Sequence, residues 1–175
     1  MPKTSKISKV ILVLLILTTI VWLGNTVSRM MFTYNIFENS QLAIKSFLTD
    51  TVLKGVLIVH QPMVSISIFS YFLMLLLFAL FLITSNLILR DNGWLFISIL
   101  LILFTAPFEI YLIIKDFSLF YTLYFTDYDL NSLMEVIYKR YSIFGSFMIV
   151  EILAYFSIVS LFIFRPFIRR PMNET

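Results

Sequence analysis

Two glutamates, Glu109 and Glu151, each interrupt a long apolar run in the second half of this chain. A charged side chain inside a membrane span is costly, so it usually faces protein or water and marks a candidate functional site. The chemistry open to two such carboxyl groups is the binding of a proton or another cation, or the formation of a structural ion pair.

The depth of the two glutamates allows them to meet. With a rise of about 1.5 Å per residue, Glu151 lies roughly 2 Å and Glu109 roughly 7 Å to the outer side of the midpoints of their spans. Residues three, four and seven apart share a helix face. This spacing puts Tyr155 within reach of Glu151 and predicts a polar stripe on the preceding span, formed by Ser98, Thr105, Glu109 and Asp116.

Arg29 offers a structural alternative to transport chemistry. It lies near the outer end of the first apolar run, and a long arginine side chain can reach several ångströms along the bilayer normal. An ion pair between Arg29 and Glu109 would then join the first span to the third without any transport role.

The last apolar run has a second face that needs a neighbour. Small side chains allow close contact between helices in lipid, and they lie broadly opposite Glu151, at Ser142, Gly145, Ser146, Ser157 and Ser160. A span with two such faces in a bundle of four helices indicates a partner subunit or self-association.

Composition identifies the class of protein. Apolar residues make up 60% and charged residues 13% of the chain, and the mean hydropathy is +0.96, which is typical of a membrane protein. About 20 apolar residues are needed to cross the hydrocarbon core. Four stretches satisfy this, approximately residues 10–27, 63–89, 95–114 and 141–164. We therefore expect an all-α, integral membrane four-helix bundle with one transmembrane domain over residues 1–175.

Lysine and arginine positions predict the orientation. The N-terminus, the turn at Arg90 and the C-terminal tail are basic, whereas the two longer connecting segments balance their basic residues with acids. The positive-inside rule then places both termini in the cytoplasm of a plasma (inner) membrane.

The two outer segments have their own patterns. Residues 39–59 carry apolar side chains at mostly helical spacing, which predicts an amphipathic helix in the membrane interface. Residues 117–128 are rich in aromatic side chains and suit the aromatic belt of an interface. Ser132 and Glu135 form a capping box that would start the fourth helix outside the membrane.

Several functions lack support in the sequence. The absence of cysteine excludes thiolate catalysis and cysteine-ligated metals, and no serine has a histidine and an acid at a recognisable spacing. His60, expected at the outer surface, is interpreted as a solvated or capping residue. The acidic run that starts at Asp127 departs from the calcium loop pattern at Ser132 and Tyr138. We therefore expect no enzyme, no metal, no cofactor and no nucleic-acid partner.

The leading prediction is a non-enzymatic subunit or accessory factor of a larger membrane complex. Its partners would be the lipid bilayer and other membrane subunits or a second copy of the chain. One alternative is a proton- or cation-conducting carrier or channel that uses Glu109 and Glu151. A second alternative is a protein that binds or processes a lipid or a quinone beneath the aromatic outer segment.

Overall fold

The described part of the chain is helical and contains four long apolar helices. The computed structural model describes residues 5–38, 44–125, 130–142 and 147–168. Its elements are α1 (Lys6–Ile36), α2 (Asp50–Ser85), the 3-10 turn η1 (Leu89–Asp91), α3 (Gly93–Phe125), α4 (Leu130–Ser142) and α5 (Phe147–Phe164). Helices α1, α2, α3 and α5 are long and apolar enough to cross a membrane. This architecture suits an integral membrane protein.

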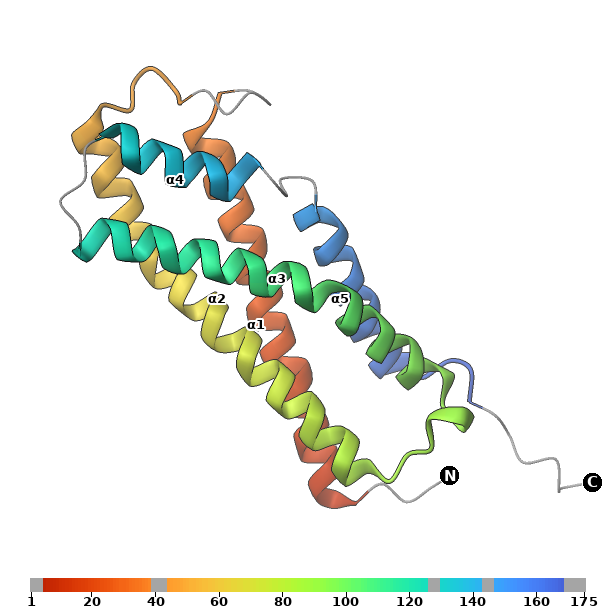
Figure 1. Cartoon of the computed structure of the whole chain (residues 1–175). Helices are drawn as coiled ribbons and strands as arrows, with labels where there is room; N and C mark the ends of the chain where they lie inside the picture. The colour runs from red at the N-terminus through yellow and green to blue at the C-terminus, as the bar shows by residue number, and fades with distance from the viewer. Residues whose placement is uncertain (1–4, 39–43, 126–129, 143–146, 169–175) are drawn as a thin grey trace, which may run out of the picture.

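The long helices form an elongated bundle with two different ends (Figure 1). Helices α1 and α2 lie side by side, α5 packs against α1 and α3, and α4 packs against α3. One end, which we call the α4 end, holds α4, the end of α1, the start of α2 and the end of α3. The other end, which we call the terminal end, holds the start of α1, the turn between α2 and α3, and the end of α5 (Figure 1). Both described chain ends therefore lie at the same end of the bundle.

Buried positions on the long helices recur at alternating intervals of three and four residues. On α3 they include Leu95, Ser98, Ile102, Thr105, Glu109, Leu112, Asp116, Leu119 and Leu123. On α2 they include Leu53, Leu57, His60, Val64, Ser67, Tyr71, Met74, Phe78, Phe81 and Ser85. This spacing is that of coiled coils, in which a narrow stripe of each helix meets its neighbours. The stripe accommodates polar residues as well as apolar ones, so it brings the charged side chains into the interior.

Helix α2 begins earlier than the span expected at residue 63. Residues 44–49 are not helical, and α2 runs from Asp50 through Pro62 to Ser85 without a break. The separate interfacial helix expected over 39–59 is therefore not found in the described part of that segment, because its second half is the first part of α2. A proline costs one backbone hydrogen bond, and membrane helices tolerate it where neighbouring groups compensate.

The aromatic segment and the fourth helix also differ from expectation. Residues 117–125 continue α3 as far as Phe125, and residues 126–129 lie outside the described part. The helix expected to run from the capping box into the fourth span is described as two helices, α4 and α5, which point in different directions (Figure 1). At the α4 end an apolar cluster joins α1, α2, α3 and α4 through Ile36, Phe37, Leu53, Leu57, Leu119, Leu123, Leu133 and Ile137.

At the terminal end, the backbone after α5 lies in close contact with the start of α3. The N–H of Gly93 donates to the carbonyl of Phe167 over 3.0 Å, and a Cβ at position 93 would lie 2.9 Å from the Cβ of Phe167. The Arg165 guanidinium lies 5.6 Å from the centroid of the Trp94 ring. The segment after α5 is thus held against the start of α3, at a position where only glycine fits without displacement.

Candidate functional site

The carboxyl groups of Glu109 and Glu151 meet inside the bundle. Glu109 on α3 and Glu151 on α5 are 5% and 1% exposed. Each lies one helical turn from the hydrogen bond that joins Thr105 of α3 to Tyr155 of α5, and the two carboxyl groups act on each other electrostatically. The two glutamates that the sequence places at similar depth thus form a carboxyl pair between α3 and α5.

Hydroxyl groups and an indole surround this carboxyl pair. The hydroxyls of Thr105 and Tyr155 are hydrogen-bonded 3.4 Å apart, and the ring centroid of Trp22 lies 4.5 Å from that of Tyr155. The ring centroid of Tyr71 on α2 lies 5.7 Å from that of Trp22, and Tyr155, Glu109 and Glu151 act electrostatically on Tyr71. Helices α1, α2, α3 and α5 therefore each contribute a polar side chain to one place.

Three polar atoms near the carboxyl pair have no hydrogen-bond partner among the described residues. They are Glu151 Oε1, the hydroxyl oxygen of Tyr71 and the indole Nε1 of Trp22, and all three side chains are almost completely buried. Buried polar groups are nearly always satisfied in native proteins, and an exception calls for an explanation. The rings of Trp22 and Tyr71 are neighbours, so these atoms belong to one buried polar group.

A second charged group lies toward the α4 end. Asp116 on α3 accepts from Arg29 on α1, with 2.5 Å between Nη2 and Oδ2, and from Arg140 on α4, with 2.5 Å between Nε and Oδ1. All three side chains are buried. The structure thus pairs Arg29 with Asp116, where the sequence suggested Glu109. Both guanidinium groups still act electrostatically on Glu109 and Glu151.

The remaining members of the polar stripe on α3 are satisfied locally. The hydroxyl of Ser98 donates to the carbonyl of Trp94 over 2.8 Å, and that of Thr105 lies 3.0 Å from the carbonyl of Leu101. Such bonds to the preceding turn allow a hydroxyl to be buried in a helix. Ser98 therefore contributes to packing, whereas Thr105 also contacts the polar group around Tyr155.

His60 is buried, contrary to its expected place at a solvated surface. Its ring stacks on Phe32 of α1, with centroids 3.9 Å apart and planes 5° apart, and neither ring nitrogen has a hydrogen-bond partner among the described residues. The difference arises because α2 starts at Asp50 and carries His60 on its buried stripe. Arg29, Asp116 and Arg140 act electrostatically on His60, so it borders the second charged group.

Outside the bundle core, one exposed ion pair lies on α4. The Nζ of Lys139 lies 2.5 Å from Oε1 of Glu135. This contact lowers the pKa of Glu135 from its ordinary value, because the ammonium group favours the ionised carboxylate. Both side chains are more than half exposed, so the pair contributes little to stability.

Two residues of the polar core were not singled out from the sequence: Arg140 and Asn25. Arg140 follows Leu133 and Ile137 at intervals of four and three, so the repeat itself would have indicated its burial. Asn25 donates to the carbonyl of Met63 over 2.6 Å and to the hydroxyl of Ser67 over 2.7 Å. It joins α1 to α2 just after Pro62.

The small residues of the last span remain without a described neighbour. Ser157 and Ser160 are exposed, and their hydroxyls donate to the carbonyls of Leu153 and Phe156 in their own helix. Gly145 and Ser146 lie outside the described residues, as does the side chain of Ser142. The face opposite Glu151 is thus open in a single copy of the chain.

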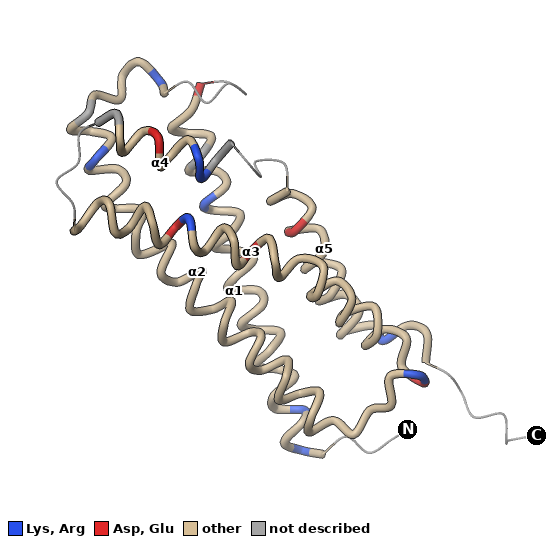
Figure 2. Tube along the Cα trace, in the orientation of Figure 1, with Lys and Arg blue, Asp and Glu red and all other residues tan. Residues whose placement is uncertain are grey.

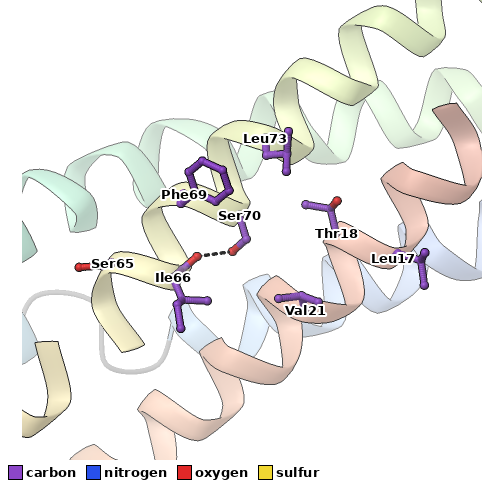
Figure 3. Close-up of a pocket in the computed structure, with 8 residues that line it drawn as sticks. All are labelled: Leu17, Thr18, Val21, Ser65, Ile66, Phe69, Ser70 and Leu73. Atoms are coloured by element: carbon purple, nitrogen blue, oxygen red, sulfur yellow. Dashed lines mark hydrogen bonds between the residues drawn. The ribbon is translucent and has the colours of Figure 1, made fainter. Parts of the chain in front are cut away.

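A groove on the surface of α1 and α2 lies apart from these polar groups (Figure 3). It has a volume of about 480 Å³ and is lined by Leu17, Thr18, Val21, Ser65, Ile66, Phe69, Ser70 and Leu73. The hydroxyl of Ser70 donates to the carbonyl of Ile66 over 2.6 Å. The hydroxyl of Thr18 likewise donates to the carbonyl of Leu14 in its own helix, and the groove lining is mainly apolar.

Neither metal ligands nor similar proteins identify a function for this chain. Within the four described ranges, no group of three or more His, Asp or Glu side chains could hold a metal ion. Comparison with protein-family models, curated proteins and solved structures gave no match to this chain. Function is therefore argued from the geometry of the polar core.

Proposed function

We propose that this chain is a non-enzymatic integral membrane protein that binds a proton or another cation at Glu109 and Glu151 and carries it across the membrane. The observation that supports this most is the contact between two buried carboxyl groups on neighbouring candidate spans. Ionisable residues inside membrane spans commonly mark ion pathways and proton relays.

The distribution of charge favours entry from the α4 end. The charged residues lie at the terminal end and in the half of the bundle toward α4, including the first part of α5, and a long stretch between these two regions carries none (Figure 2). That stretch is filled by an apolar cluster with several large aromatic rings, among them Phe78, Phe81, Trp94 and Phe162. A carrier would have to rearrange this cluster during its cycle, so we favour a carrier over an open channel.

The proposed orientation follows the basic residues. Lys6, Lys9, Arg90 and Arg165 lie at the terminal end, and the positive-inside rule makes this the cytoplasmic side. The α4 end would then face outward, with a plasma (inner) membrane as the proposed location. One tag placed at the α4 end and another at the terminal end, each assayed for accessibility to a protease in intact cells, test this orientation.

Flux through reconstituted liposomes tests the proposed function. We expect the purified full chain to dissipate an imposed pH or sodium gradient, and we expect Glu109→Gln and Glu151→Gln to reduce the rate at least tenfold. Glu135→Gln is the matched control, because it removes an exposed carboxylate on α4 that lies outside the candidate spans. Equal flux in the wild type and in both glutamine variants of the carboxyl pair would rule out this function.

A second candidate function is that of a subunit or accessory factor of a larger membrane complex. It is favoured by the outward face of α5, where Ser157 and Ser160 lie among the exposed side chains of Leu153, Phe156 and Ile163. Small residues on a lipid-facing stripe permit close approach of another helix. This role is compatible with cation binding, since many carriers are oligomers or parts of larger assemblies.

Native purification with mass-spectrometric identification of associated chains tests this second role. Ser157→Trp should release any bound subunit, because the indole would occupy the contact. Ser28→Trp is the control, since Ser28 is also exposed and donates to a carbonyl of its own helix, but lies on α1. Recovery of the same partner with both variants, or of no partner with the wild type, would argue against the role.

A further inference from the structure

We infer that the carboxyl pair of Glu109 and Glu151 is a site for one monovalent positive charge, for which a proton and a sodium ion compete. This inference rests on the carboxyl pair of the proposed function. It concerns which species binds and how many, and it does not require transport.

The first argument is electrostatic. Adjacent carboxylates that are both ionised repel strongly away from water, so a buried carboxyl pair favours a positive charge between its two members. The guanidinium groups of Arg29 and Arg140 already act on both glutamates. With Asp116 ionised between the two arginines, two positive and three negative side chains leave a net charge of −1. One additional positive charge balances this group, whereas a divalent ion would bring one charge too many.

The second argument is the set of oxygen atoms. Oxygen atoms of carboxylates and neutral groups are the ligands of hard cations. Glu151 Oε1 and the Tyr71 hydroxyl are buried without a described partner. The Tyr155 and Thr105 hydroxyls lie 3.4 Å apart, one helical turn from Glu151 and Glu109 respectively. The Tyr71 hydroxyl is independent of the carboxyl pair, because it comes from a different helix and faces the glutamates. These atoms provide a neutral oxygen shell in addition to the carboxylates.

The third argument separates sodium from calcium. Calcium sites usually collect six to eight oxygen ligands, several of them from carboxylates. In the described part of the chain, no third His, Asp or Glu side chain joins the carboxyl pair in a group able to hold a metal ion, and Asp116 is bound by two arginines. The site is therefore expected to reject divalent cations.

The titration of this site involves every helix packed around it. The charged and titratable groups that face it are Arg29 of α1, Tyr71 of α2, Asp116 of α3, Arg140 of α4 and Tyr155 of α5, with His60 next to the arginines. Because protons and sodium compete for one position, each should weaken the apparent binding of the other. A ligand that binds the folded protein alone raises its stability by mass action.

The test is thermal unfolding of the full chain in detergent, in sodium chloride, choline chloride or calcium chloride at matched ionic strength and at several pH values. At sodium about a hundredfold above its Kd, we expect the unfolding midpoint to rise by roughly 5–10 °C relative to choline. The rise should grow as the pH increases, since fewer protons compete, and calcium should give no rise beyond choline.

Variants separate the site from general salt effects. Glu109→Gln and Glu151→Gln should abolish the sodium shift, and Glu135→Gln should retain it. Tyr71→Phe keeps the ring and both carboxyl groups but removes one oxygen, so it should reduce the shift at least twofold even if a glutamine variant fails to fold. A sodium shift that is unchanged in Tyr71→Phe and in either folded glutamine variant would overturn the inference, as would a larger shift with calcium.

The unfolding and flux measurements together distinguish failure of this inference from failure of the proposed function. A sodium shift that depends on the carboxyl pair, together with no flux in liposomes, supports the site and rejects the carrier. Proton flux that depends on the carboxyl pair, without any sodium shift, supports the carrier and overturns the sodium competition inferred here.

Discussion

The guanidinium of Arg140 on α4 contacts both carboxylate oxygens of Asp116 on α3, at 2.5 Å from Nε to Oδ1 and 3.2 Å from Nη2 to Oδ2. The same carboxylate accepts from Arg29 on α1. Bidentate arginine–carboxylate contacts combine two charge-assisted hydrogen bonds and fix the relative geometry of the groups. Asp116 therefore links three helices at the α4 end.

The first prediction concerns loss of this carboxylate. Asp116→Asn should lower the free energy of unfolding by about 3–5 kcal/mol, because it leaves two buried guanidinium groups without the charge that compensates them. Denaturant unfolding in mixed micelles measures the change. Glu135→Gln, which removes an exposed carboxylate, should stay within about 0.5 kcal/mol of the wild type.

A double variant checks whether the charges are coupled. Combined Asp116→Asn and Arg140→Gln should cost less than the sum of the two single changes, because each removes a group that the other needs. Additive costs would show that Asp116 and Arg140 do not stabilise each other.

A second prediction concerns the contact between Gly93 and Phe167. Gly93→Ala should destabilise the fold by about 1–3 kcal/mol, since the new Cβ would lie 2.9 Å from the Cβ of Phe167 and would force the segments apart. The unfolding midpoint measures the cost, and faster proteolysis after α5 would locate it at the terminal end.

The matched control for Gly93 is Gly55, which also lies in a helix. A Cβ at position 55 meets nothing within 4 Å, so Gly55→Ala should be neutral or stabilising by up to about 1 kcal/mol through its helix propensity. Equal effects of the two alanine substitutions would contradict the close approach at Gly93.

Much of the polar core was predictable because polar residues on apolar helices must face the interior. The stripe of Ser98, Thr105, Glu109 and Asp116 follows from helical spacing alone, and all four side chains are buried. The meeting of Glu109 with Glu151 followed from their depth. These inferences depend on one helix at a time and on the length of a span.

Features that depend on several helices were not predictable in this way. The depth of Arg29 is compatible with Glu109 and with Asp116, and the choice between them involves Arg140 on α4, which reaches Asp116 only in the folded chain. The start of α2 was misplaced because Pro62 is a common boundary signal. Here the helix continues through the proline into the cluster around Leu53 and Leu57.

A third prediction concerns the link between α1 and α2 after Pro62. Asn25→Leu preserves approximate volume but removes the bonds from Nδ2 to the Met63 carbonyl and the Ser67 hydroxyl. The cost should be about 0.6–1.7 kcal/mol, the range of hydrogen bonds between membrane helices. Ser28→Ala, one turn further along α1, removes only a bond within its own helix and should change stability by less than about 0.5 kcal/mol.

A fourth prediction concerns pH and the exposed pair of Glu135 and Lys139. Since the pKa of Glu135 is lowered from its ordinary value of 4.5, the pair stabilises α4 above that value and loses its contribution as the pH falls through the lowered pKa. Carbon NMR of labelled glutamate should give a titration midpoint below 4.5 for Glu135. Lys139→Gln should return this midpoint toward the ordinary value, and added salt should do the same in the wild type, because exposed charges are screened. A midpoint that responds to neither change would show that the Lys139 ammonium is not its cause.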